Sequence, residues 1–297
     1  MNFKEEQEKR VLETEQIIKG YLPKETGYQK TVLSAMNYSI LAGGKRLRPL
    51  LMWETYKMFG GHGKEIEPFM AAIEMVHTYS LVHDDLPAMD NDEYRRGRKT
   101  THVVYGEAMA ILAGDALLNM AFETAAKAFT MEADAARVGA ALAVFAKKAG
   151  IYGMIGGQTA DIEAENMGDE VTEELLLFIH EHKTAALIQS AMMTGAILAG
   201  ASDEDVQKIE KIGYDIGIAF QIQDDILDVT GSMELLGKPI GSDEKNHKVT
   251  YVTLKGLEQA EADQRAISGE AAELLASFEN RNLFLEELVK SLITRKK

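Results

Sequence analysis

Residues 84–90 read DDLPAMD and residues 220–228 read FQIQDDILD, and both acidic clusters are embedded in long apolar stretches rich in Ala, Leu, Ile and Met. At helical spacing Gln221, one of the two adjacent aspartates and Asp228 fall along one stripe, and isoleucines occupy the other sides. A polar stripe on an otherwise apolar helix faces either solvent or a functional cavity. The apolar cover favours the cavity here, so we expect two helices that each present carboxylates to an internal hollow.

The rest of the chain is also helical in pattern. Ala, Leu, Met, Glu and Lys dominate, only five prolines occur, and alternating runs of Val, Ile and Thr between turns are missing. We expect breaks at residues 60–63, 91–100 and 166–170 and a longer loop over 231–248. No linker, repeat or low-complexity tract divides the sequence, which predicts a single all-α domain over residues 1–297.

The balance of charge limits the possible partners. Lys and Arg total 32 against 47 Asp and Glu, for a formal net charge of −15, which argues against nucleic acid and anionic membrane surfaces. There is no Cys, so disulfide and thiolate chemistry are excluded. The charged N-terminal segment lacks the apolar core of a secretory signal. The uncharged stretch 184–202 contains Gln189 and Thr194 and fits a buried helix better than a membrane span. We expect a cytoplasmic protein without stable membrane association.

The density of carboxylates points to a metal. Buried carboxylates are costly unless a cation neutralises them, and Mg²⁺ prefers oxygen ligands while leaving positions for phosphate oxygens. Two facing clusters therefore suggest a diphosphate held between metal ions, although each cluster alone could be a solvated acidic patch. On a straight helix Asp90 would point about 120° away from Asp84. Pro87 could break the helix and bring Asp90 round to share a metal, or it could end the helix and leave Asp90 in solvent.

Two basic clusters accompany the acids. In GGKRLRP at residues 43–49, Lys45 and Arg48 are three apart and are expected on one helix face, where they form a diphosphate cradle with the backbone near Gly44. The run RRGRK at 95–99 follows the first acidic cluster, so that Arg95 and Arg96 could each grip the phosphates of one substrate. Either run alone could be a solvated surface loop.

In this order the motifs resemble those of the trans-isoprenyl diphosphate synthases, and most of all the bacterial farnesyl diphosphate synthases. The motifs are GGKRLRP at 43–49, DDLPAMD at 84–90 with RRG at 95–97, GGQTAD at 156–161, HKT at 182–184, FQIQDDILD at 220–228, and GK at 237–238. The resemblance implies an all-helical homodimer in which each subunit is a large helical bundle around a deep central cavity.

The resemblance also implies roles for individual residues. The expected Mg²⁺ ligands, for about three ions per site, are Asp84, Asp90, Asp161 and Asp224, with Asp85 and Asp228 behind them. The allylic diphosphate would be held by Arg95, Lys183, Gln221 and Lys238, and isopentenyl diphosphate by Gly44, Lys45, Arg48, His77 and Arg96. Thr184 and Phe220 would also contact substrate.

The implied reaction is a prenyl transfer by Mg²⁺-assisted ionisation, condensation and elimination. The resemblance makes Arg95, Lys183, Thr184 and Gln221 the catalytic residues. The Thr184 hydroxyl, the Lys183 carbonyl and the Gln221 amide oxygen would stabilise the allylic carbocation, and the released diphosphate would remove the proton.

Product length should depend on Tyr79 and Ser80, five and four positions before Asp84. An aromatic residue at the former position, together with the Pro87-Ala88 insertion, resembles the pattern of enzymes that make the fifteen-carbon farnesyl product. Tyr79 could instead be ordinary core. The alternatives are a geranylgeranyl diphosphate synthase, a class I terpene cyclase, which would not need the Lys45 and Arg48 pocket, and a silent regulatory subunit, which would have lost part of an acidic cluster.

Overall fold

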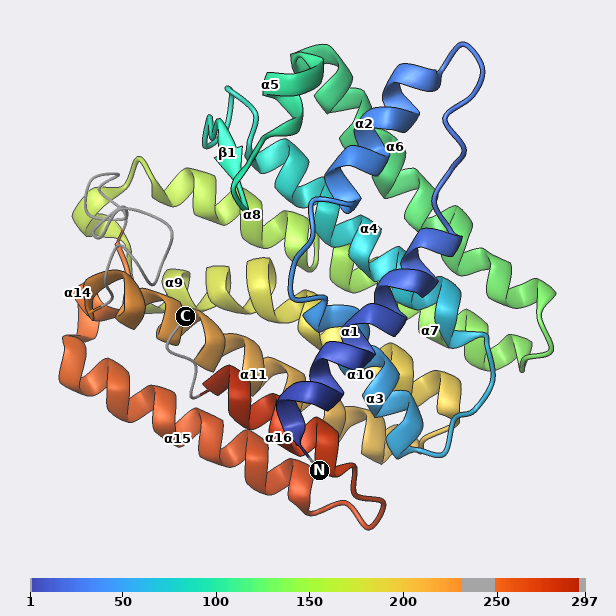
Figure 1. Ribbon diagram of the computed structural model, residues 1–297. Helices are drawn as coiled ribbons and strands as arrows, with labels where there is room; N and C mark the ends of the chain where they lie inside the picture. The colour runs from blue at the N-terminus through green and yellow to red at the C-terminus, as the bar shows by residue number, and fades with distance from the viewer. Residues whose placement is uncertain (1, 231–248, 294–297) are drawn as a thin grey trace.

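The computed structural model describes residues 2–230 and 249–293, and this part of the chain is almost entirely helical (Figure 1). A two-stranded antiparallel hairpin pairs Tyr94 with Lys99 and Arg95 with Arg98. The first half contains α1 (Phe3–Gly20), α2 (Lys30–Ile40), α3 (Leu47–Met58), α4 (Ile66–Asp84), β1 (Tyr94–Arg95), β2 (Arg98–Lys99), α5 (Thr101–Tyr105), α6 (Glu107–Ala126) and η1 (Lys127–Thr130).

The second half contains longer helices and one π-helical segment. Its elements are α7 (Ala135–Ala149), α8 (Met154–Ala164), η2 (Gly168–Glu170), α9 (Glu173–Ile179), η3 (His180–Ala185), α10 (Ala186–Ala199), α11 (Asp203–Thr230), α14 (Tyr251–Lys255), α15 (Leu257–Ala276) and α16 (Leu283–Ile293). The all-α prediction is confirmed. Three predicted breaks, at 60–63, 91–100 and 166–170, lie between α-helices, the last of them containing the short 3₁₀ turn η2, and the loop predicted over 231–248 lies outside the described residues.

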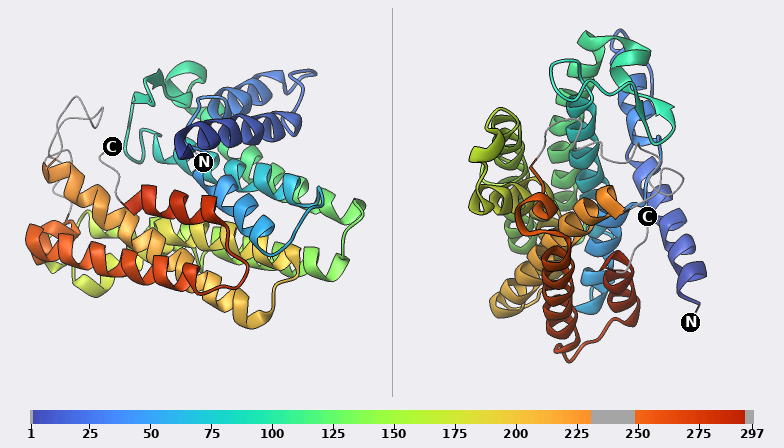
Figure 2. Two further views of the ribbon diagram at one scale, coloured as in Figure 1. Left: turned by 60° about the horizontal axis from the view of Figure 1, so that its bottom comes forward. Right: turned by 90° about the vertical axis from the view of Figure 1, so that its left-hand side faces the viewer.

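Two helices, α4 and α10, lie at the centre of the bundle. In α10, 12 of 14 residues are buried, so the uncharged stretch that begins at Thr184 is core, as the sequence predicts. The helix α10 packs on α3, α7 and α11, while α4 packs on α6 and α3. Figure 1 shows α11, α15 and α16 at the bottom of the view and α2 and α5 at the top, with α4 and α10 between them, and the turned views of Figure 2 keep this order. The acidic residues at the ends of α4 and α11 therefore lie on helices that pack against several others in the bundle.

Two other segments, Glu107–Thr130 and Ala135–Ala164, are long and apolar enough to cross a membrane when judged by length and composition alone. Only 39% and 33% of these apolar windows are buried within the chain. Large apolar side chains therefore reach the surface of α6, among them Ile111 at 45% and Leu112 at 49% exposure.

Candidate active site

The first acidic cluster lies at the end of α4. The helix ends at Asp84, so Pro87 follows a helix end and does not kink a continuing helix. The backbone N–H of Asp90 donates to the Asp84 carbonyl at 2.9 Å, which turns the chain back toward the helix. The Asp90 side chain is exposed, while one Asp84 carboxylate oxygen accepts a hydrogen bond from the Gln158 amide at 2.7 Å. Gln158, on α8, was not among the predicted site residues, although it belongs to the GGQTAD motif.

The second acidic cluster lies on α11, which runs without a break from Asp203 to Thr230. The two adjacent aspartates of this cluster differ in burial. Asp225 is only 5% exposed, while Asp224 is more accessible. One Asp225 oxygen accepts the backbone N–H of Tyr251 at 2.8 Å, and the other lies 3.4 Å from the Gln221 amide nitrogen. Asp225 therefore links α11 to the start of α14.

A short π-helix carries the HKT motif between α9 and α10. The segment η3 directs Lys183 and Thr184 toward neighbouring helices, where Lys183 Nζ lies 2.5 Å from an Asp161 oxygen and the Thr184 hydroxyl donates to Gln221 Oε1 at 3.0 Å. These contacts bring together α8, η3 and α11. Such π-helical turns are frequent at functional sites, but the helical pattern of the sequence does not predict this one.

The close packing around η3 depends on glycine. A Cβ at Gly157 of α8 would overlap the Lys183 nitrogen and stand 2.6 Å from the His182 carbonyl carbon. Likewise, a Cβ at Gly217 of α11 would overlap Ala185, the last residue of η3. The π-helix is thus held between two helices that approach its backbone through glycine faces.

A cavity of about 710 Å³ lies between α4, α8 and η3. Its lining includes the polar groups of Asp84, Gln158, Lys183 and Thr184 together with apolar side chains such as Leu118, Ile162 and Leu187. Tyr79 lines it, is 5% exposed, and has a hydroxyl without a hydrogen-bond partner in the described structure. The predicted residues that line this cavity are Arg48, His77, Tyr79, Ser80, Asp84, Lys183 and Thr184.

The basic motif at 43–49 is arranged differently from the prediction. The helix α3 begins at Leu47, so Lys45 lies in the preceding loop and does not share a helix face with Arg48. The cause is Arg46, whose left-handed backbone (φ 48°) ends the loop immediately before the helix. Arg48 borders the cavity, and burial lowers its pKa to about 10, so the guanidinium stays charged at neutral pH.

His77 of α4 borders the same basic region. Burial, followed by the charge of Arg48, lowers the pKa of His77 well below its usual range, so the imidazole is neutral at pH 7. A neutral imidazole can still donate one N–H to a phosphate oxygen.

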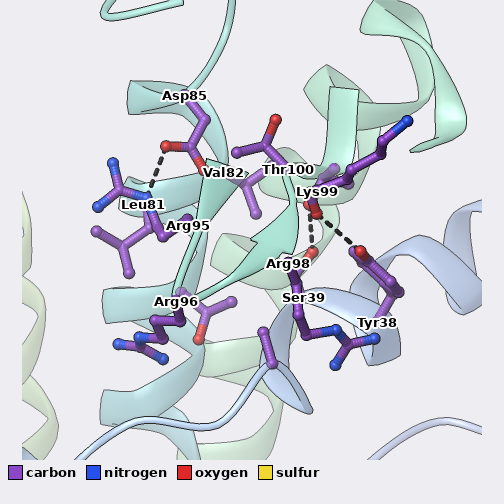
Figure 3. Close-up of a pocket in the computed structure, with 13 residues that line it drawn as sticks. Tyr38, Ser39, Leu81, Val82, Asp85, Arg95, Arg96, Arg98, Lys99 and Thr100 are labelled. Atoms are coloured by element: carbon purple, nitrogen blue, oxygen red, sulfur yellow. Dashed lines mark hydrogen bonds and ion pairs between the residues drawn. The ribbon is translucent and has the colours of Figure 1, made fainter. Parts of the chain in front are cut away.

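The hairpin arginines point to different places (Figure 3). Arg95 Nε donates to an Asp85 oxygen at 2.6 Å, while Arg96 donates to the Gly43 carbonyl. A Cβ at Gly44 would stand 2.7 Å from Arg96 Cζ, so the missing side chain leaves room for this guanidinium. Burial raises the pKa of Asp85 to about 6, and Arg95 opposes that shift. Arg95 thus contacts the first acidic cluster, whereas Arg96 contacts the 43–49 loop.

The predicted metal ligands are not assembled in advance. Within residues 2–230 and 249–293, no three acidic or histidine side chains converge to form a metal site. Asp84 contacts Gln158 and Asp161 contacts Lys183, whereas Asp90 and Asp224 do not line the cavity. Phe220 is partly buried on α11, and the predicted ligand Lys238 lies outside the described residues. Carboxylates from α4, α8 and α11 nevertheless supply the hard oxygen donors that Mg²⁺ prefers.

The chain resembles known proteins over nearly its whole length. The model of the polyprenyl synthetase family matches residues 29–288. The geranylgeranyl diphosphate synthase of Cyanophora paradoxa is 42% identical, over 89% of this chain and 87% of its own. The farnesyl diphosphate synthase of Bacillus subtilis is 44% identical, over 88% of both chains. A Helicobacter pylori geranyltransferase, solved with magnesium and isoprenyl diphosphate, superposes with a TM-score of 0.84 at 31% identity, over 99% of this chain and 97% of its own.

Proposed function

Since the chain belongs to the polyprenyl synthetase family, we propose that it condenses isopentenyl diphosphate with dimethylallyl and geranyl diphosphate to give farnesyl diphosphate and pyrophosphate. The observation that carries this proposal is a cavity of about 710 Å³ whose lining combines charged groups, among them Asp84, Arg48 and Lys183, with apolar side chains. A diphosphate requires the charged groups, and a growing prenyl chain requires the apolar ones.

The carboxylates of Asp84, Asp90, Asp161 and Asp224 would hold Mg²⁺. When bound, Mg²⁺ supplies positive charge that neutralises the departing diphosphate. Arg95 and Lys183 would bind the same diphosphate, with Gln221 and, outside the described residues, Lys238. Because Lys183 already contacts Asp161 at 2.5 Å, this lysine is positioned beside the proposed ligand set.

The allylic C–O bond then breaks and leaves a carbocation that needs oxygen atoms nearby, not a protein nucleophile. The Thr184 hydroxyl donates its proton to Gln221 Oε1, so its lone pairs remain available to the cation. We assign the same role to the carbonyl of Lys183. The double bond of isopentenyl diphosphate attacks, a carbon–carbon bond forms, and the released diphosphate takes the proton.

Isopentenyl diphosphate would bind among Gly44, Lys45, Arg48, His77 and Arg96. The hydrogen bond of Arg96 to Gly43 and the position of Arg48 at the cavity border support this assignment. A terpene cyclase uses one diphosphate and has no need for this second cationic region. A silent subunit is also disfavoured because both acidic clusters are complete.

Farnesyl diphosphate is the proposed product because Tyr79 lines the cavity five residues before Asp84. Geranylgeranyl diphosphate is the second candidate, because similar relatives carry both names. The test is to incubate the purified protein with Mg²⁺, isopentenyl diphosphate and geranyl diphosphate, and to size the dephosphorylated products. A fifteen-carbon alcohol supports the proposal, a twenty-carbon alcohol favours the second candidate, and a cyclic hydrocarbon or no product would refute both.

We also propose that the protein is a cytoplasmic homodimer. The exposed apolar residues of α6, including Ile111 and Leu112, support a subunit interface because a monomer would leave them in water.

A further inference from the structure

We infer that Arg46 and Glu74 form a buried latch that positions the 41–46 loop for isopentenyl diphosphate, and that both act as positioning residues without contacting substrate. The inference rests on the proposed function, which assigns Gly44 and Lys45 of this loop to that substrate. Neither latch residue was among the predicted site residues. The 41–46 loop connects α2 to α3.

The latch is an ion pair removed from solvent. Arg46 is 4% exposed and Glu74 is 2% exposed, and Arg46 Nη1 donates to a Glu74 carboxylate oxygen at 2.6 Å. Arg46 Nη2 donates to the Ile40 carbonyl at 2.8 Å, and its Nε lies 3.5 Å from a Glu15 oxygen. One planar guanidinium thus ties together α1, α2 and α4, a geometry that a lysine ammonium cannot reproduce.

The contact with Ile40 closes the loop on itself. Ile40 is the last residue of α2, and Arg46 is the last residue before α3. The side chain of Arg46 therefore bridges the two ends of the short segment that presents Gly44 and Lys45. Arg46 also adopts a left-handed backbone with φ 48°, which a non-glycine residue keeps only where its surroundings compensate for the cost.

The contact with Glu74 sets the loop relative to the rest of the site. Glu74 and His77 are three residues apart on α4, so they lie on neighbouring positions of one helix face. Asp84 ends the same helix. Through Glu74 the loop is thus fixed to the rigid element that carries His77 and the first predicted metal ligand.

Glu74 is also the counter-charge of the surrounding cations. It opposes the burial-driven lowering of the pKa of both Arg48 and Arg96. Removing Glu74 would therefore alter the charge of the pocket as well as the loop geometry. A test that isolates geometry must keep all charges, and Arg46→Lys does so.

The test measures binding of isopentenyl diphosphate and of geranyl diphosphate separately, by calorimetry, to the wild-type chain and to Arg46→Lys. We expect the Kd for isopentenyl diphosphate to rise about tenfold or more, because the loop is no longer preorganised. The Kd for geranyl diphosphate should stay within about twofold, because Arg95 and Lys183 lie on other elements. In steady state the KM for isopentenyl diphosphate should rise by a similar factor.

The matched control is Arg10→Lys. Arg10 also pairs with a buried glutamate, Glu54, which is 1% exposed. Its Nε donates to Glu6 at 2.9 Å. Unlike Arg48, Arg10 does not line the cavity. Thermal denaturation should show a loss of stability in both variants, whereas only Arg46→Lys should lose affinity for isopentenyl diphosphate. Equal affinity in Arg46→Lys and wild type, or equal losses in both variants, would overturn the latch.

Failure of the proposed function would look different. If the wild-type chain bound neither diphosphate, the proposed function would be overturned, and the latch with it. If the wild type bound both and Arg46→Lys bound both equally well, only the latch would be refuted.

Discussion

Gly157 of α8 lies directly against the backbone of Lys183 in the π-helix η3, and a Cβ at position 157 would stand 2.6 Å from the neighbouring His182 carbonyl carbon. The two residues belong to different motifs and are 26 positions apart in the sequence. The close contact between these two backbones sets where the Lys183 side chain and carbonyl lie relative to the cavity.

Gly157→Ala should therefore impair both stability and catalysis. The clash is with backbone, which cannot rotate away, so we expect a loss of about 1–3 kcal/mol in the free energy of unfolding. Turnover should fall more than binding of isopentenyl diphosphate, because η3 carries Lys183 and Thr184. Chemical denaturation and steady-state kinetics would measure this, and Gly139→Ala, where an added Cβ would meet no neighbouring element within 4 Å, is the control. Unchanged turnover in Gly157→Ala would contradict the role of η3.

Asp84→Ala should abolish turnover, by about 1000-fold or more, through loss of a proposed Mg²⁺ ligand. The helical circular dichroism should be unchanged, because Asp84 is the last residue of α4 and is not among the buried residues of that helix. Asp203→Ala, at the exposed start of α11, should keep full activity. Retained turnover in Asp84→Ala would refute the metal role of this residue.

Tyr79→Ala should lengthen the product, because it removes an aromatic ring from the cavity wall. Tyr79→Phe keeps the ring and deletes only a hydroxyl that has no hydrogen-bond partner among the described residues, so its product should be unchanged. Tyr152→Ala, at a tyrosine that is 73% exposed, controls for the substitution itself. Chromatography of the dephosphorylated products measures chain length, and an identical profile for Tyr79→Ala and wild type would count against Tyr79 as the limit.

Stability should fall in mild acid because of His180. Burial lowers the pKa of His180 to about 4, so its 3.8 Å contact with Asp225 is not an ion pair at neutral pH. The unfolded chain binds the proton first, near pH 6.5. The stabilisation is therefore present above pH 6.5 and is lost as pH falls toward 4, by about 2 kcal/mol between pH 7 and 5.

Urea denaturation at several pH values tests this. The slope of unfolding free energy against pH should be smaller in His180→Gln than in wild type. His62→Gln, in an exposed loop, should retain the wild-type slope. Parallel slopes in wild type and His180→Gln would show that another group is responsible.

Leu112→Arg should disrupt the proposed dimer. Leu112 is 49% exposed on α6, and an arginine there would bury a charge in an apolar interface. Light scattering should report twice 32.8 kDa for the wild type and 32.8 kDa for the variant. Leu12→Arg, at a 60% exposed leucine of α1, should remain dimeric. A wild-type monomer would exclude the homodimer.

The helical fold follows from local pattern, and so does much of the candidate site. Asp84, His77 and Tyr79 lie on one helix, where spacing alone predicts their relative directions. The error at Lys45 arose because the left-handed backbone of Arg46 accompanies side-chain contacts with Ile40 and with the distant Glu74, which helical periodicity does not encode.

The π-helix was missed for a similar reason. The extra residue in its turn is stabilised by packing between α8 and α11, and the sequence of η3 is compatible with an ordinary α-helix. The glycines of GGQTAD were the available signal, because a glycine inside a helix often marks a close approach of another backbone. The partner of that approach could be identified only in three dimensions.

The placement of Glu74, His77, Tyr79 and Asp84 along α4 limits how such a protein can change over evolution. Each added or deleted residue would turn everything beyond it by about 100° and shift it by about 1.5 Å. A single-residue insertion between His77 and Asp84 would thus separate the anion-binding end from the acidic end. Diversification of this helix must proceed by exchanging side chains at fixed length.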